Sequence, residues 1–195
     1  MSLRLPVRAL QRAWVSAPGS LSAHLHQARP PLRVQPLREA RVSLLPYELE
    51  GLREPAGTAA RGREVVLWGG GQAMVLARSV VAAVHSRGVW RALRGLGSRS
   101  LAELLFSRSD VSRSAITWQW LPPRHPQVRQ LARTWSRVHA QPWPGGGVWR
   151  RHSVFTRGHQ PLLVAEFFAP ALMRDWPRRV RHHGRCTRRR VRSTA

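Results

Sequence analysis

An acidic residue in an apolar stretch is the first candidate for chemistry in this chain of 195 residues. Glu166 is one of only nine acidic residues, and it lies within residues 162–168, LLVAEFF. A buried carboxylate costs free energy unless it is paired, and carboxyl groups in such surroundings often belong to functional sites. Alternatively, Glu166 faces solvent, because side chains alternate between the two faces of a strand. From these residues alone, the two interpretations carry equal weight.

Two further patterns are typical of ligand sites but have simpler interpretations. The glycine run 69–71 could cradle a phosphate, yet no Gly-Lys-Ser or Gly-Lys-Thr follows it, and β-prone runs flank it on both sides. We therefore interpret it as the turn of a hairpin. His182, His183 and Cys186 could bind a metal, but the chain has no second cysteine and the stretch around them is strongly basic. We expect neither a metal site nor a cofactor.

Hydrophobic periodicity indicates which elements position these groups. Alternation and β-propensity predict two hairpins and two further strands, over residues 63–81, 148–168, 32–39 and 111–120. Helical spacing is found between the strands, in a helix after Pro6, in two short helices with a glycine elbow within residues 85–106, and over residues 128–138. Residues 40–62 are rich in Pro, Gly and acids and predict a loop.

This order of elements predicts an α+β fold, because the strands come in hairpins without regular alternation of strand and helix. We expect a single domain over residues 1–173, with an antiparallel β-sheet and flanking helices. One sheet face would be covered by helices, and the other would be solvated or line a cavity. Residues 174–195 hold nine arginines against the single acid Asp175, so we expect a disordered basic tail there.

The net charge of +24 is compatible with a nucleic-acid-binding protein. However, all 33 basic residues are arginine and none is lysine, which indicates a compositional bias more than a surface selected for polyanions. The charge would still attract a small anionic substrate. The single cysteine fits a reducing compartment, and no apolar run approaches the roughly 20 residues that span a bilayer. We therefore expect a cytoplasmic monomer without a specific nucleic-acid partner or membrane insertion.

Four segments, in their order and spacing, resemble the chorismate pyruvate-lyase family. They are residues 14–22 (WVSAPGSLS), 32–39 (LRVQPLRE), 63–81 (REVVLWGGGQAMVLARSVV) and 148–170 (VWRRHSVFTRGHQPLLVAEFFAP). Residues 96–106 (LGSRSLAELLF) resemble a fifth segment, with Ser100 and Ala102 in place of the family's Pro and Gly; Ala40 and His152 are further departures. The resemblance implies an antiparallel sheet with an enclosed pocket. It also implies cofactor-free cleavage of chorismate into 4-hydroxybenzoate and pyruvate, the first step of ubiquinone synthesis.

The resemblance also implies roles for individual residues. Arg63 would bind the ring carboxylate of the substrate, helped by backbone groups of Leu21 and Leu101. Glu166 would meet the 4-hydroxyl group, and Glu166 and Arg63 would be the catalytic residues. The chemistry is compatible with these roles, because a guanidinium group presents a planar fork of donors that matches a carboxylate.

Other charged residues of the same segments are less informative. Without the resemblance, Arg63 itself would be interpreted as a surface cation at the start of a strand. Arg78 is a weaker candidate for the site, and we expect Glu64 and Arg151 to serve structure.

Two rival functions are compatible with these residues. The effector domains of some transcription regulators resemble this fold and bind small molecules without turnover, but they follow a helix-turn-helix domain, and only 13 residues precede Trp14. A basic RNA-binding protein would show aromatic side chains interleaved with arginine, a pattern that Trp118, Trp120 and Arg113 permit.

Overall fold

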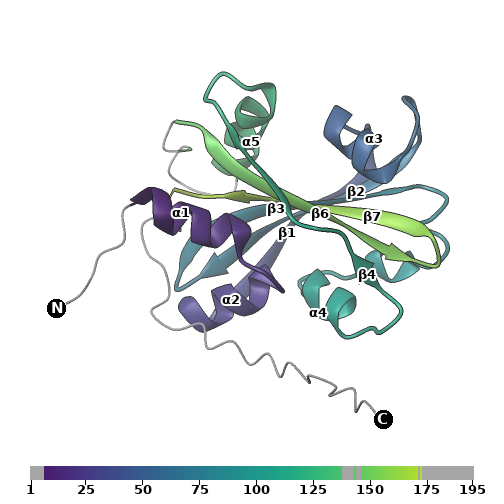
Figure 1. The fold of residues 1–195 in the computed structure, drawn as a ribbon, viewed down its shortest axis with the longest axis horizontal. Helices are drawn as coiled ribbons and strands as arrows, with labels where there is room; N and C mark the ends of the chain where they lie inside the picture. The colour runs from purple at the N-terminus through teal and green to yellow at the C-terminus, as the bar shows by residue number, and fades with distance from the viewer. Residues whose placement is uncertain (1–6, 138–142, 144–145, 171, 173–195) are drawn as a thin grey trace, which may run out of the picture.

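The computed structural model describes residues 7–137, 143, 146–170 and 172, which form one α+β domain (Figure 1). In chain order the elements are α1 (Val7–Ser16), α2 (Leu21–Ala28), β1 (Leu32–Val42), α3 (Pro46–Leu52), β2 (Ala60–Gly69), β3 (Gln72–Ala82), a 3-10 turn (Arg91–Leu93), α4 (Leu101–Phe106), β4 (Ser112–Arg113), β5 (Thr117–Leu121), α5 (Pro126–Ser136), β6 (Val148–Arg157) and β7 (Gln160–Phe168). Among these residues, no helix has the length and apolar character needed to cross a membrane. The expected tail and the domain boundary at residue 173 lie outside the described residues.

All the strands join one antiparallel sheet of order β1-β2-β3-β7-β6-β4, and β5 also pairs with β6. Both predicted hairpins are confirmed, and the pairing of β3 with β7 places them side by side in the centre of the sheet. Gly70 and Gly71, with φ of 55° and 77°, form the first turn in a conformation that glycine adopts at low cost. The glycine run is therefore a hairpin turn, as the flanking β-prone runs predict.

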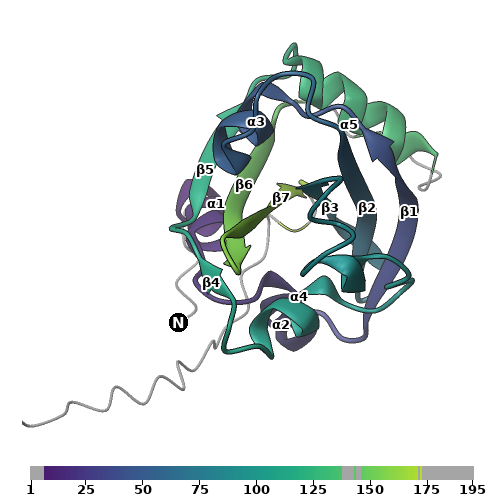
Figure 2. The ribbon, with the colours of Figure 1, turned by 90° about the vertical axis from the view of Figure 1, so that its right-hand side faces the viewer.

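One face of the sheet is covered by α3 and α5, which lie on the opposite side from α2 and α4 in both ribbon views (Figure 2). Val128, Leu131 and Trp135 are spaced to share one side of α5, and all three are buried. They belong to a core cluster that also includes Val66 of β2 and Leu163 of β7. The amphipathic pattern predicted over residues 128–138 thus produces a helix that seals this face.

The other face carries two separate core clusters. The first, which we call the α2 cluster, joins the N-terminal helices to the centre of the sheet and includes Trp14, Leu21, Leu25, Val65, Met74 and Phe168. The second, the α4 cluster, includes Trp90, Leu101, Leu105, Phe155 and Leu162. Helices thus pack against both faces, and between these two clusters the second face also lines a cavity, which is one of the two alternatives predicted for it.

Residues 40–62, predicted as a loop, contain the helix α3. Pro46 occupies the first helical turn, where the missing N–H has no intrahelical acceptor to lose. The carboxylate of Glu48 accepts a hydrogen bond from the backbone N–H of Leu45 at 2.9 Å, which satisfies one of the free donors at the helix start. The same Pro and acidic residues that favour a loop therefore begin a helix here.

The region between β3 and β5 also differs from the prediction. Only α4 forms within residues 85–106, because the first predicted helix is a 3-10 turn of three residues. Gly95 and Gly97 have φ of 78° and 55°, so the glycine elbow itself is present. The strand predicted over residues 111–120 is divided into β4 and β5.

A buried ion pair joins α3 to the sheet on the face covered by α5. Arg78 donates through Nε to Oε1 of Glu48 at 2.7 Å and through Nη2 to Oε2 at 3.2 Å, and Glu48 is fully buried. Arg78 also donates through Nη1 to Glu64 at 2.8 Å. Removing one partner of such a pair leaves a buried charge without compensation.

Glu48→Gln is therefore expected to lower the free energy of unfolding by about 3 kcal/mol, measured by urea denaturation. Glu50→Gln, on the exposed side of the same helix, is the matched control and should change the free energy by less than about 0.5 kcal/mol. Equal effects of the two substitutions would contradict the role of the Glu48 and Arg78 pair.

Candidate active site

A cavity separates the α2 cluster from the α4 cluster, on the sheet face covered by α1, α2 and α4. It comprises about 580 Å³ of space between side chains, a figure that includes space open to solvent. Its walls are largely apolar, with side chains such as Val34, Val65, Leu67, Leu105 and Phe155. All four residues assigned to the site by the resemblance, Leu21, Arg63, Leu101 and Glu166, line this cavity.

Arg63 extends from β2 into the cavity and is only 6% exposed. Its Nη2 donates to the backbone carbonyls of Gly97 at 2.8 Å and Arg99 at 3.2 Å, in the loop before α4. In the described part of the chain it forms no ion pair with a carboxylate. Burial lowers the pKa of the Arg63 guanidinium, and the charge of Glu39 opposes this shift. Arg63 is thus a desolvated cation held in place by neutral groups, which suits it to bind an anion.

Leu21 and Leu101 share one structural feature: each is the first residue of a helix, α2 and α4 respectively. The first N–H groups of a helix have no acceptor within the helix, and they favour negative charge. Ser20 and Ser100 precede them as N-caps, and their hydroxyls accept from Ala23 and Ala102 at 3.2 Å. Ser100, where the family has Pro, therefore still begins the helix correctly.

Glu166 lies on β7 directly opposite Arg151 of β6. Its carboxylate accepts a hydrogen bond from Nε of Arg151 at 2.5 Å, and its side chain is 14% exposed. Arg151 is 1% exposed and donates through Nη1 to Ala17 at 2.9 Å. The side chain of Glu166 is therefore part of the cavity lining and is held by a buried partner.

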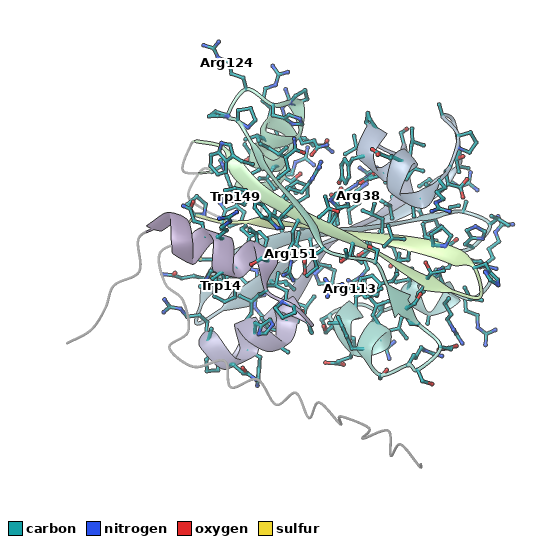
Figure 3. All side chains as sticks on the ribbon, viewed as in Figure 1. Trp14, Arg38, Arg113, Arg124, Trp149 and Arg151 are labelled. Carbon is teal, nitrogen blue, oxygen red and sulfur yellow. The ribbon has the colours of Figure 1, made fainter. Side chains whose placement is uncertain are left out.

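Sequence reasoning missed two cavity residues, Arg113 and Arg151, which lie near the middle of the molecule (Figure 3). Arg151 was expected to serve structure, and Arg113 was considered only as part of an RNA surface. Arg113 donates through Nε to Oγ of Ser153 at 2.9 Å and through Nη1 to the carbonyl of Gly19 at 2.7 Å. Burial lowers the pKa of the Arg113 guanidinium. The charge of Glu166 raises this pKa, and the charge of Arg151 lowers it further. Arg151 lies in a segment that resembles the family, but no local pattern distinguishes Arg113 among 33 arginines.

The other candidates lie away from this cavity. Arg78 faces the opposite side of the sheet, where its pairing with Glu48 and Glu64 gives it and Glu64 a structural role. Within the described ranges, no three His, Cys, Asp or Glu side chains are grouped as metal ligands would be. His182, His183 and Cys186 lie outside those ranges.

Comparison with known sequences decides the family, because the sequence model of chorismate lyase matches residues 3–178. The chain belongs to the chorismate lyase family. Relatives named "Probable chorismate pyruvate-lyase" agree: that of Albidiferax ferrireducens is 38% identical over 83% of this chain and 82% of its own length. The relative from Halorhodospira halophila is 40% identical over 85% of this chain and 83% of its own length. The relative from Nitrosomonas europaea is 34% identical over 83% of this chain and 87% of its own length. As a member of this family, the protein is a lyase.

Solved structures support the fold alone. The effector domain of PhnF from Mycobacterium smegmatis superimposes with a TM-score of 0.56 at 14% identity, covering 78% of this chain and 90% of that domain. A PhnF C-terminal domain superimposes with a TM-score of 0.53, also at 14% identity, covering 75% of this chain and 87% of that domain. This chorismate lyase family member thus shares its α+β architecture with these two PhnF domains.

The charge of the cavity fits the substrate class of chorismate lyases. Three guanidinium groups, those of Arg63, Arg113 and Arg151, face one carboxylate, that of Glu166. Inside apolar walls these charges are screened much less than at the surface. The site therefore favours a small organic anion over a neutral ligand.

Proposed function

We propose that this protein converts chorismate into 4-hydroxybenzoate and pyruvate without a cofactor, as the first step of ubiquinone synthesis. The observation that carries the proposal is the placement of Arg63 and Glu166 in one apolar cavity. β3 lies between their strands, so their backbones are two inter-strand spacings apart, about 10 Å across the sheet. The two groups thus come from different strands of one cavity, as binding at the two poles of one ring requires.

In this arrangement Arg63 holds the ring carboxylate, together with the first N–H groups of α2 and α4 at Leu21 and Leu101. Glu166 accepts a hydrogen bond from the 4-hydroxyl group at the other pole of the ring. A ligand fixed at both poles inside apolar walls is held in a single orientation, which is the main contribution that such a protein can make to a reaction driven by aromatisation.

The reaction balances within the substrate itself. The bond between C3 and the ether oxygen breaks, and that oxygen becomes the ketone oxygen of pyruvate. The hydrogen at C4 leaves as a proton, its bonding electrons complete the aromatic ring, and the departing methylene gains a proton to become the methyl group. The residues of this chain bind and orient the substrate, exclude water and stabilise developing charge.

The test is to incubate the full-length protein with chorismate and to follow 4-hydroxybenzoate by absorbance and pyruvate by a coupled lactate dehydrogenase assay. Equal amounts of the two products are expected, and added EDTA should leave the rate unchanged. Tight binding of chorismate without release of pyruvate would contradict the proposal and would favour a ligand-sensing role.

A further inference from the structure

The assignments proposed above leave one charged group of chorismate without a partner. Arg63 accounts for the ring carboxylate and Glu166 for the hydroxyl group, but the enolpyruvyl side chain carries a second carboxylate. Moving a carboxylate from water into an apolar cavity is costly unless a cation or several donors receive it. Within the described part of the chain, the cavity offers two further cations, Arg113 and Arg151.

The charge of Arg151 is already compensated by a carboxylate, although its buried Nη2 has no hydrogen-bond partner among the described residues. Arg151 is 1% exposed, it pairs with Glu166, and it donates to backbone carbonyls of Trp14 and Ala17 near the end of α1. Its charge therefore compensates Glu166, the only carboxylate that the described residues contribute to the cavity lining. Arg113, in contrast, donates hydrogen bonds to the neutral acceptors Ser153 and Gly19, and no ion pair involves it among the described residues.

The register of the sheet shows where Arg113 lies relative to Arg63. Arg63, Ser79, Val164 and Ser153 form one row across β2, β3, β7 and β6, and all four line the cavity. Arg63 stands at one end of this row. The Arg113 guanidinium is hydrogen-bonded to Ser153 at the other end, three inter-strand spacings or about 14 Å away in the backbone. The cavity thus has a cation at each end of its floor.

The position of Glu166 decides which carboxylate each cation faces. Glu166 is two residues from Val164 on β7, the strand next to Ser153, so it lies toward the Arg113 end of the row. In chorismate the enolpyruvyl ether is on C3, next to the hydroxyl-bearing C4, while the ring carboxylate is on C1, opposite C4. A ring whose hydroxyl meets Glu166 directs its carboxylate toward Arg63, and one of its two orientations about the C1–C4 axis brings the C3 side chain to the Arg113 end.

We propose that Arg113 forms a second carboxylate subsite, which binds the enolpyruvyl carboxylate of the substrate and the same group of departing pyruvate. This inference rests on the proposed function. Nε and Nη1 of Arg113 are bonded to Ser153 and Gly19, which leaves Nη2 for the ligand. The rings of Phe155 and Phe106, at 5.2 and 5.6 Å from the guanidinium carbon, contact the same group. Arg113 is therefore oriented before the ligand arrives, so that little side-chain entropy is lost on binding.

The subsite makes a selective prediction, because 4-hydroxybenzoate lacks the second carboxylate. Arg113→Gln is expected to raise the KM for chorismate about 10- to 100-fold, and to leave the dissociation constant of 4-hydroxybenzoate within about 2-fold. Arg113→Lys, which keeps the charge, should recover part of the loss. Arg157→Gln is the matched control, since Arg157 pairs with Asp110 outside the cavity and should affect neither ligand.

A ligand pair tests the same subsite without any substitution and without turnover. By calorimetry, the dianion 4-hydroxy-3-(carboxymethoxy)benzoate should bind the wild-type protein about 10-fold tighter than 4-hydroxy-3-methoxybenzoate, which lacks the second carboxylate. Arg113→Gln should abolish that preference. A protein that prefers the dianion but does not cleave chorismate would refute the proposed function and keep the subsite.

Two results would overturn the subsite. The first is a wild-type protein with no preference for the dianion, which remains decisive even if Arg113→Gln fails to fold. The second is an Arg113→Gln protein that loses affinity equally for chorismate and 4-hydroxybenzoate, because Arg113 would then only fasten the loop at Gly19 to β6.

Discussion

Arg63→Ala should weaken the binding of both chorismate and 4-hydroxybenzoate by about one to two decades while leaving the protein folded. Both ligands carry the ring carboxylate, and a charge-assisted hydrogen bond in a buried site contributes roughly 1.5 to 3 kcal/mol. The effect on both ligands separates Arg63 from Arg113, whose loss should affect chorismate alone. Dissociation constants from calorimetry and a KM from the absorbance assay are the measurements.

Arg61→Ala is the matched control for Arg63→Ala. Arg61 lies two residues earlier on β2, is 29% exposed in its side chain, and pairs with Glu39 at 3.6 Å outside the cavity lining. An exposed pair of this kind contributes little to stability, so the control should retain both affinities. Unchanged affinity for 4-hydroxybenzoate in Arg63→Ala itself would show that another group binds the ring carboxylate.

Glu166→Gln is expected to weaken the binding of 4-hydroxybenzoate by about one to two decades and to relieve product inhibition. The amide keeps the shape of the side chain but loses the charge that accepts the 4-hydroxyl group and pairs with Arg151. A rigid product held at both poles of an apolar cavity leaves slowly, so steady-state turnover of the wild type should be limited by release. Loss of the Glu166 charge should therefore speed release.

Single-turnover measurements on Glu166→Gln separate two roles of the carboxylate. A fall in the chemical rate of about 10²- to 10⁴-fold would assign proton transfer to Glu166, whereas an unchanged rate would assign hydrogen bonding alone. Glu64→Gln is the matched control, because Glu64 also pairs with a buried arginine, Arg78, but on the other face of the sheet. Equal loss of product affinity in both variants would show that the effect comes from a broken ion pair and not from the site.

Much of the fold was predictable because its strongest signals are local. The hairpins around Gly70 and Gly158 follow from turn glycines between β-prone runs, and each strand begins and ends near its predicted bounds. The helix α3 was not predictable in the same way. Its first residues, including Pro46 and Glu48, suit a loop as well as a helix start, and the buried partner that favours the helix, Arg78, is 30 residues away.

The candidate site also combines features that the sequence determines with features that only the tertiary structure decides. By itself, the sequence determined that Glu166 is an acid in an apolar strand, and that the family motifs include Arg63, Leu21 and Leu101, since these are properties of short segments. Only the tertiary structure decided that Glu166 lines a cavity and does not face solvent, because alternation along one strand does not say which face is covered.

The tertiary structure alone also singled out Arg113 and Arg151. In sequence they are two of 33 arginines, and no local pattern shows which of these arginines are buried. Pairing of β4 and β6, and of β6 and β7, brings them beside Glu166, and the register of β2, β3, β7 and β6 sets Arg63 at the far end of the same row. Strand pairing between distant segments is decided by the packing of the whole core, so the charge pattern of this cavity exists only once the chain is folded.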